Sequence, residues 1–191
     1  MEDVLLEGGY VRKLWIGEAK TYADHLLRLD PDSRHRRFGG AVSNDFIRRH
    51  ADKARGFNVV IYGFFLDGVL RGACELHIDH PMFRGEAEAA FSIERDWQSH
   101  GIGSVLLERM LLTARNRGVR KLRMYCLAEN ERMQQLARKF DAELSFDFGN
   151  VVGDVDPPRS TALSMMREWA ADSYSVASAI FDAQSRLLRT A

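Results

Sequence analysis

The segment Gln98-Ser99-His100-Gly101-Ile102-Gly103 has the residue types and the spacing of an anion-binding turn. An apolar run at 87–93 precedes it, and apolar residues after it repeat at the spacing of one helix face: Leu107, Met110, Leu111 and Ala114. Glycines, which lack a Cβ, let the backbone approach a bulky anion, and the N–H groups of a first helical turn point towards it. We therefore expect residues 98–104 to bind a pyrophosphate.

Two other phosphate-binding loops do not fit this segment. A P-loop requires GxxxxGK[ST] with its lysine, and a dinucleotide-binding loop requires GxGxxG with an acidic residue about 20 residues further on. The pattern in this chain is QxxGxG. It is accompanied by Ile93-Glu94-Arg95-Asp96-Trp97 before the turn and by Leu127-Ala128-Glu129-Asn130 after the following helix.

This combination resembles the acyl-CoA loop of the Gcn5-related N-acetyltransferase (GNAT) superfamily. The resemblance extends from Tyr10 to Arg167 and is strongest between Glu88 and Phe140. It implies an α/β (α+β) fold with a mixed central β-sheet of about seven strands flanked by helices. It also implies acetyl-CoA as the co-substrate and a primary amine as the acceptor of the acetyl group.

The resemblance also implies how the cofactor is bound. In this family the fourth and fifth strands separate, so unpaired backbone groups of the fourth strand bind the pantetheine arm and polarise the thioester carbonyl. Phe91, Ser92 and Ile93 would supply those groups. Asn130 would position the cofactor or substrate, unless it only caps the next helix. The cofactor phosphates would bind at the turn, which is formed by Gln98, Ser99, His100, Gly101, Ile102, Gly103 and Ser104.

Glu88 is the candidate general base. An alkylamine has a reference pKa near 10.4, so a base must remove a proton before the amine attacks. Glu88 lies on the strand expected to hold the thioester, where apolar neighbours would raise its pKa by desolvation. Its face of the strand should adjoin the face of the preceding strand that carries Glu75 and His77. The alternatives are a purely structural glutamate here and Glu86 as the base.

Two classes of acceptor fit the sequence. The Ala-Glu-x-Ala strand at 87–90 and the arginine-rich segment at 33–38 resemble bacterial protein lysine acetyltransferases, which favours a protein lysine. A small amine, such as a polyamine, an amino acid or an antibiotic, fits nearly as well because acceptor loops vary on this fold. Many family members carry a tyrosine general acid where this chain has Ala137. A third interpretation is therefore an acyl-CoA-binding regulatory domain without turnover.

Periodicity and turn signals predict the elements that position these residues. Residues 57–66 and 69–78 should form a hairpin around Asp67-Gly68, a type I′ signal. The arginine-rich residues 32–40 are expected to be a loop. The other expected strands are 9–15, 87–93, 121–127, 142–148 and 161–166, and the other expected helices are 18–29, one starting at Ser43, one ending near Gly118, 131–140 and 169–189.

Length and composition limit the remaining possibilities. The length of 191 residues suggests one domain with an added segment. The resemblance implies an acetyltransferase domain at 1–167, and we expect the helical extension at 168–191 to pack on it. The alternative is that this helix forms a dimer contact, so both a monomer and a homodimer stay open. Lys plus Arg equals Asp plus Glu at 27 each, which disfavours nucleic-acid and anionic-membrane partners. No targeting segment or long apolar run is present, so we expect a cytoplasmic location. Cys74 and Cys126 are expected to be buried free thiols, and the His77-x-Asp79-His80 segment is not expected to bind a metal.

Overall fold

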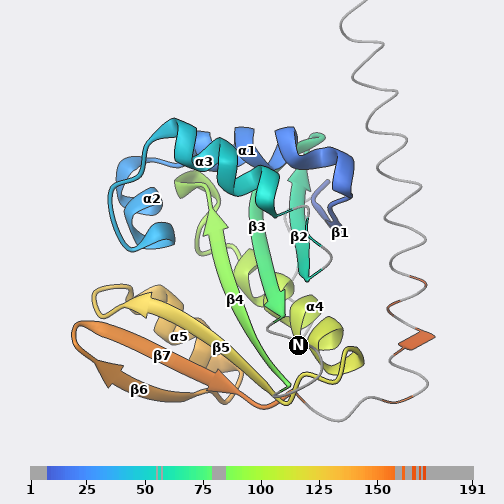
Figure 1. The fold of residues 1–191 in the computed structure, drawn as a ribbon, viewed down its shortest axis with the longest axis vertical. Coiled ribbons are helices and arrows are strands. Elements are labelled where there is room, and N and C mark those ends of the chain that lie inside the picture. Colours follow the sequence, from blue (N-terminus) through green and yellow to red (C-terminus); the bar gives the residue numbers. More distant parts are fainter. Residues whose placement is uncertain are drawn as a thin grey trace, which may run out of the picture.

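A computed structural model describes residues 8–157 apart from 55, 57 and 79–84, together with 161, 165, 166, 168 and 170. Its described part contains a seven-stranded sheet in the order β1-β2-β3-β4-β5-β7-β6 (Figure 1). The β4–β5 pair is parallel and the other pairs are antiparallel, which confirms the expected mixed sheet. The strands are β1 (Tyr10–Lys13), β2 (Val59–Leu66), β3 (Val69–Ile78), β4 (Glu86–Ile93), β5 (Lys121–Leu127), β6 (Glu143–Asp147) and β7 (Asn150–Val155).

Helices cover both faces of this sheet. On one face a core cluster joins α1 and α3 to β2 and β3, with Leu26, Ile47 and Phe65 fully buried. On the other face a second cluster lies under α4, with Leu106, Leu107 and Met110 fully buried. The helices are α1 (Ala19–Arg28), α2 (Pro31–Phe38), α3 (Asn44–Lys53), α4 (Ile102–Asn116) and α5 (Glu131–Lys139), with short 3-10 turns at Ile16–Glu18 and Arg95–Trp97.

The β2–β3 hairpin forms where the sequence predicts it. Asp67 and Gly68 both have positive φ, at 52° and 71°, as a type I′ turn requires. Val59–Leu66 pairs with Val69–Ile78 through a single register shift between Phe64 and Phe65. The hairpin places Glu75 and His77 on the face covered by α1 to α3.

The expected loop at 32–40 is wrong for residues 32–38, which belong to α2. Asp30 caps the helix by accepting from the N–H of Ser33, and Pro31 occupies its first turn, where a missing N–H is tolerated. Gly39 ends it in the left-handed region, with φ 68°. The capping signals therefore outweigh the weak apolar periodicity, and the arginine-rich segment becomes an ordered helix beside β4 and β5.

The last strand is also placed differently from the prediction at 161–166. Phe148 and Gly149 turn the chain with positive φ values of 41° and 85°, and Asn150–Val155 returns as β7 between β5 and β6. Residues 162–164 lie outside the described residues, and Met165 and Met166 are helical. The expected helix at 169–189 lies outside the described residues apart from Ala170. The domain division at 168 stays a prediction.

The feature that creates the site is the divergence of β4 and β5. The two strands pair only where they begin, at Glu86 to Glu88 against Lys121 to Arg123. Beyond that point they separate, and α2 lies beside the opening between them (Figure 1). None of the described helices combines the length and the apolar composition needed to span a membrane.

Candidate functional site

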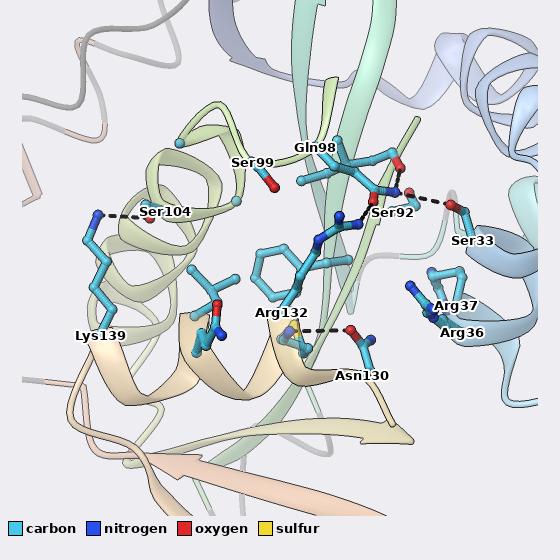
Figure 2. Close-up of a pocket in the computed structure, with 17 residues that line it drawn as sticks. Ser33, Arg36, Arg37, Ser92, Gln98, Ser99, Ser104, Asn130, Arg132 and Lys139 are labelled. Atoms are coloured by element: carbon cyan, nitrogen blue, oxygen red, sulfur yellow. Dashed lines mark hydrogen bonds between the residues drawn. The ribbon is translucent and has the colours of Figure 1, made fainter. Parts of the chain in front are cut away.

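A cavity of about 380 Å³ lies where β4 and β5 have separated. Its walls come from α2, β4, the turn after β4, the start of α4, and α5 (Figure 2). Four basic side chains and no acidic side chain occur among the described residues that line it, so the cavity favours an anionic ligand. The basic residues are Arg36, Arg37, Arg132 and Lys139.

The N-terminus of α4 opens into this cavity without a side-chain cap. Gly101 is the capping residue, with φ 78°, and the first turn contains no acidic residue. By contrast, α2, α3 and α5 are capped by side chains of Asp30, Ser43 and Asn130. The N–H groups of Ile102 and Gly103 precede the first intrahelical hydrogen bond of α4. An anion at this end would receive both these donors and the favourable end of the helix dipole.

Gln98 connects three walls of the cavity. Its Nε2 donates to the Ser33 hydroxyl at 3.1 Å and to the Ile93 carbonyl at 2.9 Å. Its Oε1 accepts a hydrogen bond from Arg132 on α5 (Figure 2). The glutamine of QxxGxG therefore fixes the turn relative to α2, β4 and α5, in addition to any contact with a ligand.

The second glycine of the turn is required for packing. A Cβ at Gly103 would lie 3.3 Å from Leu136 Cδ2 and 3.6 Å from Ile93 Cδ1. Gly103 therefore lets α4 approach α5 and the end of β4. The two glycines have separate roles, since Gly101 supplies a left-handed φ and Gly103 supplies space.

The backbone N–H and C=O groups of successive β4 residues point alternately towards β3 and towards the opening between β4 and β5. Glu94 donates its N–H to the Arg71 carbonyl at 3.0 Å, and Ser92 is registered opposite Ala73. In an antiparallel pair, hydrogen-bonded residues alternate with non-bonded ones, so Ser92 bonds to β3. The main-chain groups of Phe91 and Ile93 then face the opening, in agreement with the bond from Gln98 to the Ile93 carbonyl.

Glu88 is the last residue of β4 that pairs with β5. It therefore lies at the point where the two strands begin to separate, which we call the vertex. Its side chain is exposed and does not line the cavity, so the apolar burial expected around it is absent. It is registered opposite His77 on β3. The alternative base, Glu86, is held in an ion pair by Arg123 at 3.0 Å.

Glu75 is a fully buried carboxylate next to this vertex. It accepts from Arg37 at 2.5 Å, and ring nitrogens of His50 and His77 each lie 2.9 Å away. Burial alone would raise the pKa of Glu75, but Arg37 and the two histidines hold it well below its ordinary value. The hydrogen bond with Glu75 in turn raises the pKa of His77. This network connects a cavity-lining arginine to the strand position opposite Glu88.

A second buried network lies behind Ser92. Its hydroxyl is 3.0 Å from His25 Nε2, and His25 Nδ1 is 3.2 Å from Glu94. Glu94 also accepts from Arg28 and Arg71, each at 2.9 Å. Burial lowers the pKa of His25 despite the neighbouring carboxylate, which favours the neutral imidazole. The network fixes α1 to the end of β4 and so supports the cavity wall.

The structure brings most of the predicted site residues together. His100 is exposed and bonds to the Gln98 carbonyl, while the side chain of Ile102 is buried in the core, so neither side chain lines the cavity. Asn130 lines it and also accepts from the Met133 N–H, so it caps α5. The predicted residues among the lining are Phe91, Ser92, Ile93, Gln98, Ser99, Gly101, Gly103, Ser104 and Asn130.

The sequence analysis did not predict that residues of α5 line the cavity. Arg132, Met133, Gln135, Leu136 and Lys139 line the cavity from this helix. Arg132, Leu136 and Lys139 repeat at helical spacing, but a set that mixes basic and apolar residues resembles an ordinary amphipathic surface. Ala137, the position at which the family resemblance implies a tyrosine, is buried and is not part of the lining.

Comparison with known proteins agrees with this geometry. The sequence model described as the acetyltransferase (GNAT) family matches residues 24–142, more than half of the chain. The chain belongs to the GNAT acetyltransferase family.

Solved GNAT structures share the fold at low sequence identity. The GNAT domain of PAT from S. lividans has a TM-score of 0.65 at 23% identity, covering 78% of this chain and 90% of that one. The PaiA N-acetyltransferase from Thermoplasma acidophilum, in complex with coenzyme A, has a TM-score of 0.58 at 18% identity, covering 78% and 98%. YncA, a putative acetyltransferase from Salmonella typhimurium with acetyl-CoA, has a TM-score of 0.59 at 15% identity, covering 81% and 97%.

Proposed function

We propose that this protein is an acetyl-CoA-dependent N-acetyltransferase that uses the cavity between β4 and β5. The observation that supports this most strongly is the meeting of the uncapped α4 terminus and the open edge of β4 in one cationic cavity. The pyrophosphate would bind the N–H groups at Gly101 to Ser104. The pantetheine arm would then extend along β4, where it replaces the main-chain partner that β5 no longer provides.

Backbone groups would also polarise the thioester. The N–H groups of Phe91 and Ile93 face the opening by the alternation described above, so either can donate to the thioester carbonyl as it becomes an oxyanion. The attacking amine must be neutral. We assign proton removal to Glu88, which lies at the vertex and is exposed to solvent, and not to Glu86, which Arg123 already engages.

The proposed reaction is direct transfer. Glu88 first takes a proton from the ammonium form of the acceptor, directly or through water, and the neutral amine nitrogen then attacks the thioester carbonyl. After the attack the nitrogen gives up a second proton to water. The tetrahedral intermediate then collapses, the C–S bond breaks, and coenzyme A leaves as the thiol after taking up a proton. A thiol has a reference pKa near 8.5, so it leaves readily, and water can replace the tyrosine acid absent at Ala137.

We propose a primary amine as the acceptor, with a protein lysine favoured by the Ala-Glu-x-Ala strand and a small amine as the alternative. A catalytically silent acyl-CoA-binding domain is the alternative from a different class, supported by the missing tyrosine. Calorimetry with coenzyme A followed by thiol-release assays against lysine peptides and small amines separates the three. Binding with turnover identifies the acceptor class, binding without turnover favours the silent domain, and no binding contradicts the assignment.

A further inference from the structure

Arg36 is a basic side chain of the cavity that forms no hydrogen bond or ion pair with a described residue. It lines the cavity from α2, and its Nε is buried without a hydrogen bond. Other arginines with a buried, unbonded Nε use another guanidinium nitrogen: Arg34 donates to Asn44, Arg37 to Glu75 and Arg71 to Glu94. Within the part of the chain that the structure describes, no such contact is made by Arg36. A half-buried guanidinium on the cavity wall, without a described protein acceptor, favours a ligand that supplies one.

No carboxylate of the described residues forms an ion pair with Arg36. Its neighbour Arg37 is neutralised by the buried Glu75 carboxylate. Of the other two basic residues of the cavity, Arg132 donates to Gln98 and Lys139 donates to Ser104. Arg36 therefore presents a full positive charge on the α2 wall, in a cavity whose described lining has no carboxylate.

Arg36 lies at the end of the cavity away from the start of α4. Figure 2 shows Ser104 and Lys139 at one end, and Arg36 and Arg37 beside Ser92 at the other. Helix α2 contacts both β4 and β5. If the phosphates bind at the α4 terminus and the arm follows β4, as proposed above, Arg36 is at the end where the acyl group meets the acceptor. The inference rests on that proposed function.

We infer that Arg36 is a specificity-determining residue that binds a carboxylate on one of the two substrates. A planar guanidinium pairs with a carboxylate through two parallel hydrogen bonds, which fixes orientation as well as charge. The carboxylate belongs either to a dicarboxylic acyl group on the donor thioester or to the acceptor, next to its reactive amine. With acetyl-CoA as the donor, the inference favours the small-amine alternative in the form of an amino acid, because an acetyl group and a protein lysine would leave Arg36 without a partner.

Two arms of one experiment distinguish these sources. The donor arm compares kcat/KM for acetyl-CoA and succinyl-CoA with an acceptor that lacks a carboxylate. The acceptor arm uses acetyl-CoA and compares an amino acid with its amide. In one arm the wild type should prefer the carboxylate form, and Arg36→Gln should reduce this preference by about 10- to 100-fold, as expected for loss of a charged hydrogen bond.

The matched control is Arg49→Gln, which removes an exposed arginine from α3 outside the cavity and should leave both preferences unchanged. The absence of a carboxylate preference in both arms would overturn the inference while leaving acetyl transfer intact. A loss of CoA affinity in Arg36→Gln with unchanged affinity for dephospho-CoA would also overturn it, because Arg36 would then bind the 3′-phosphate. Failure of the wild type to bind CoA would instead refute the proposed function and this inference together.

Discussion

The side-chain amide of Gln98 donates to the main-chain carbonyl of Ile93 at 2.9 Å, across the turn that joins β4 to α4. This bond joins the turn to the open edge of β4, and so connects the proposed anion-binding helix terminus to the proposed thioester-binding strand. The same side chain reaches Ser33 and Arg132. One glutamine thus determines the geometry of the turn from three sides.

Replacing Gln98 by Met tests this role. The change keeps the length of the side chain but removes all three hydrogen bonds and leaves the Ile93 carbonyl without its donor. We expect about 1–3 kcal/mol of lost stability and weaker CoA binding, because the turn is no longer held in place. Urea denaturation measures the first effect and calorimetry the second. Unchanged CoA affinity would show that the turn is fixed by other contacts.

Gly101→Asp tests the anion site at the α4 terminus. The substitution places a Cβ at φ 78° and a carboxylate where the phosphate should bind, so CoA affinity should fall at least tenfold. Gly118→Asp is the matched control, because Gly118 follows the other end of α4 with φ 74° and a Cβ there would have no neighbour within 4 Å. In both variants a non-glycine residue must adopt a positive φ, so the conformational cost of the two substitutions is similar. Equal losses of CoA affinity in the two would contradict the site.

Glu88→Gln tests the general base. The change is nearly isosteric, so CoA binding should persist while turnover near pH 7 falls by about 10²- to 10⁴-fold. The deficit should shrink as the pH rises towards the amine pKa, because more of the acceptor is already neutral. Glu86→Gln is the control, since that carboxylate is engaged by Arg123. A pH-rate profile in which the Glu86 variant carries the deficit would transfer the role to Glu86.

The Glu75 network makes stability depend on acid pH. The folded-state pKa of Glu75 lies well below its ordinary value of about 4.3, so its stabilising contribution is complete above that value and is lost as the pH falls through the folded pKa. Glu75→Gln leaves Arg37 buried without its counterion, and we expect about 3–5 kcal/mol of destabilisation at pH 7. The variant should also lose less stability on acidification. The free energy of unfolding of both proteins is measured by urea denaturation as the pH is lowered. An equal loss in the wild type and in Glu75→Gln would contradict this account.

Local signals explain which parts of this fold the sequence could predict. The Asp67-Gly68 hairpin and the Gly101 turn depend on backbone conformations that a few residues specify. Helix α2 was not predicted because its apolar residues are few and Gly39-Gly40 indicates a loop, although Asp30 and Pro31 provide starting signals. Strand β7 was also missed, since it contains Gly153. That glycine is needed because a Cβ there would lie 3.2 Å from both Ala137 and Leu144.

The site could be predicted mainly where its residues are contiguous in the sequence. Residues 91–104 are contiguous, so a motif identifies them. The environment of Glu88, by contrast, depends on how β3 and α2 pack. The nearby Glu75 on β3 accepts a hydrogen bond from Arg37 on α2, which lies 38 positions away in the sequence. The absence of a described partner for Arg36 likewise follows from the packing of α2 beside β4 and β5. Neither relationship has a sequence signature.

The most direct test of the central claim is to measure acetyl transfer and CoA release together. The wild type is incubated with acetyl-CoA and a panel of lysine peptides and small amines, and free thiol is quantified alongside the acetylated product by mass spectrometry. We predict thiol release that depends on the amine, matches the N-acetyl product one to one, and is lost in Gly101→Asp but kept in Gly118→Asp. Thiol release without N-acetyl product, or no release with any amine although coenzyme A binds, would contradict an N-acetyltransferase.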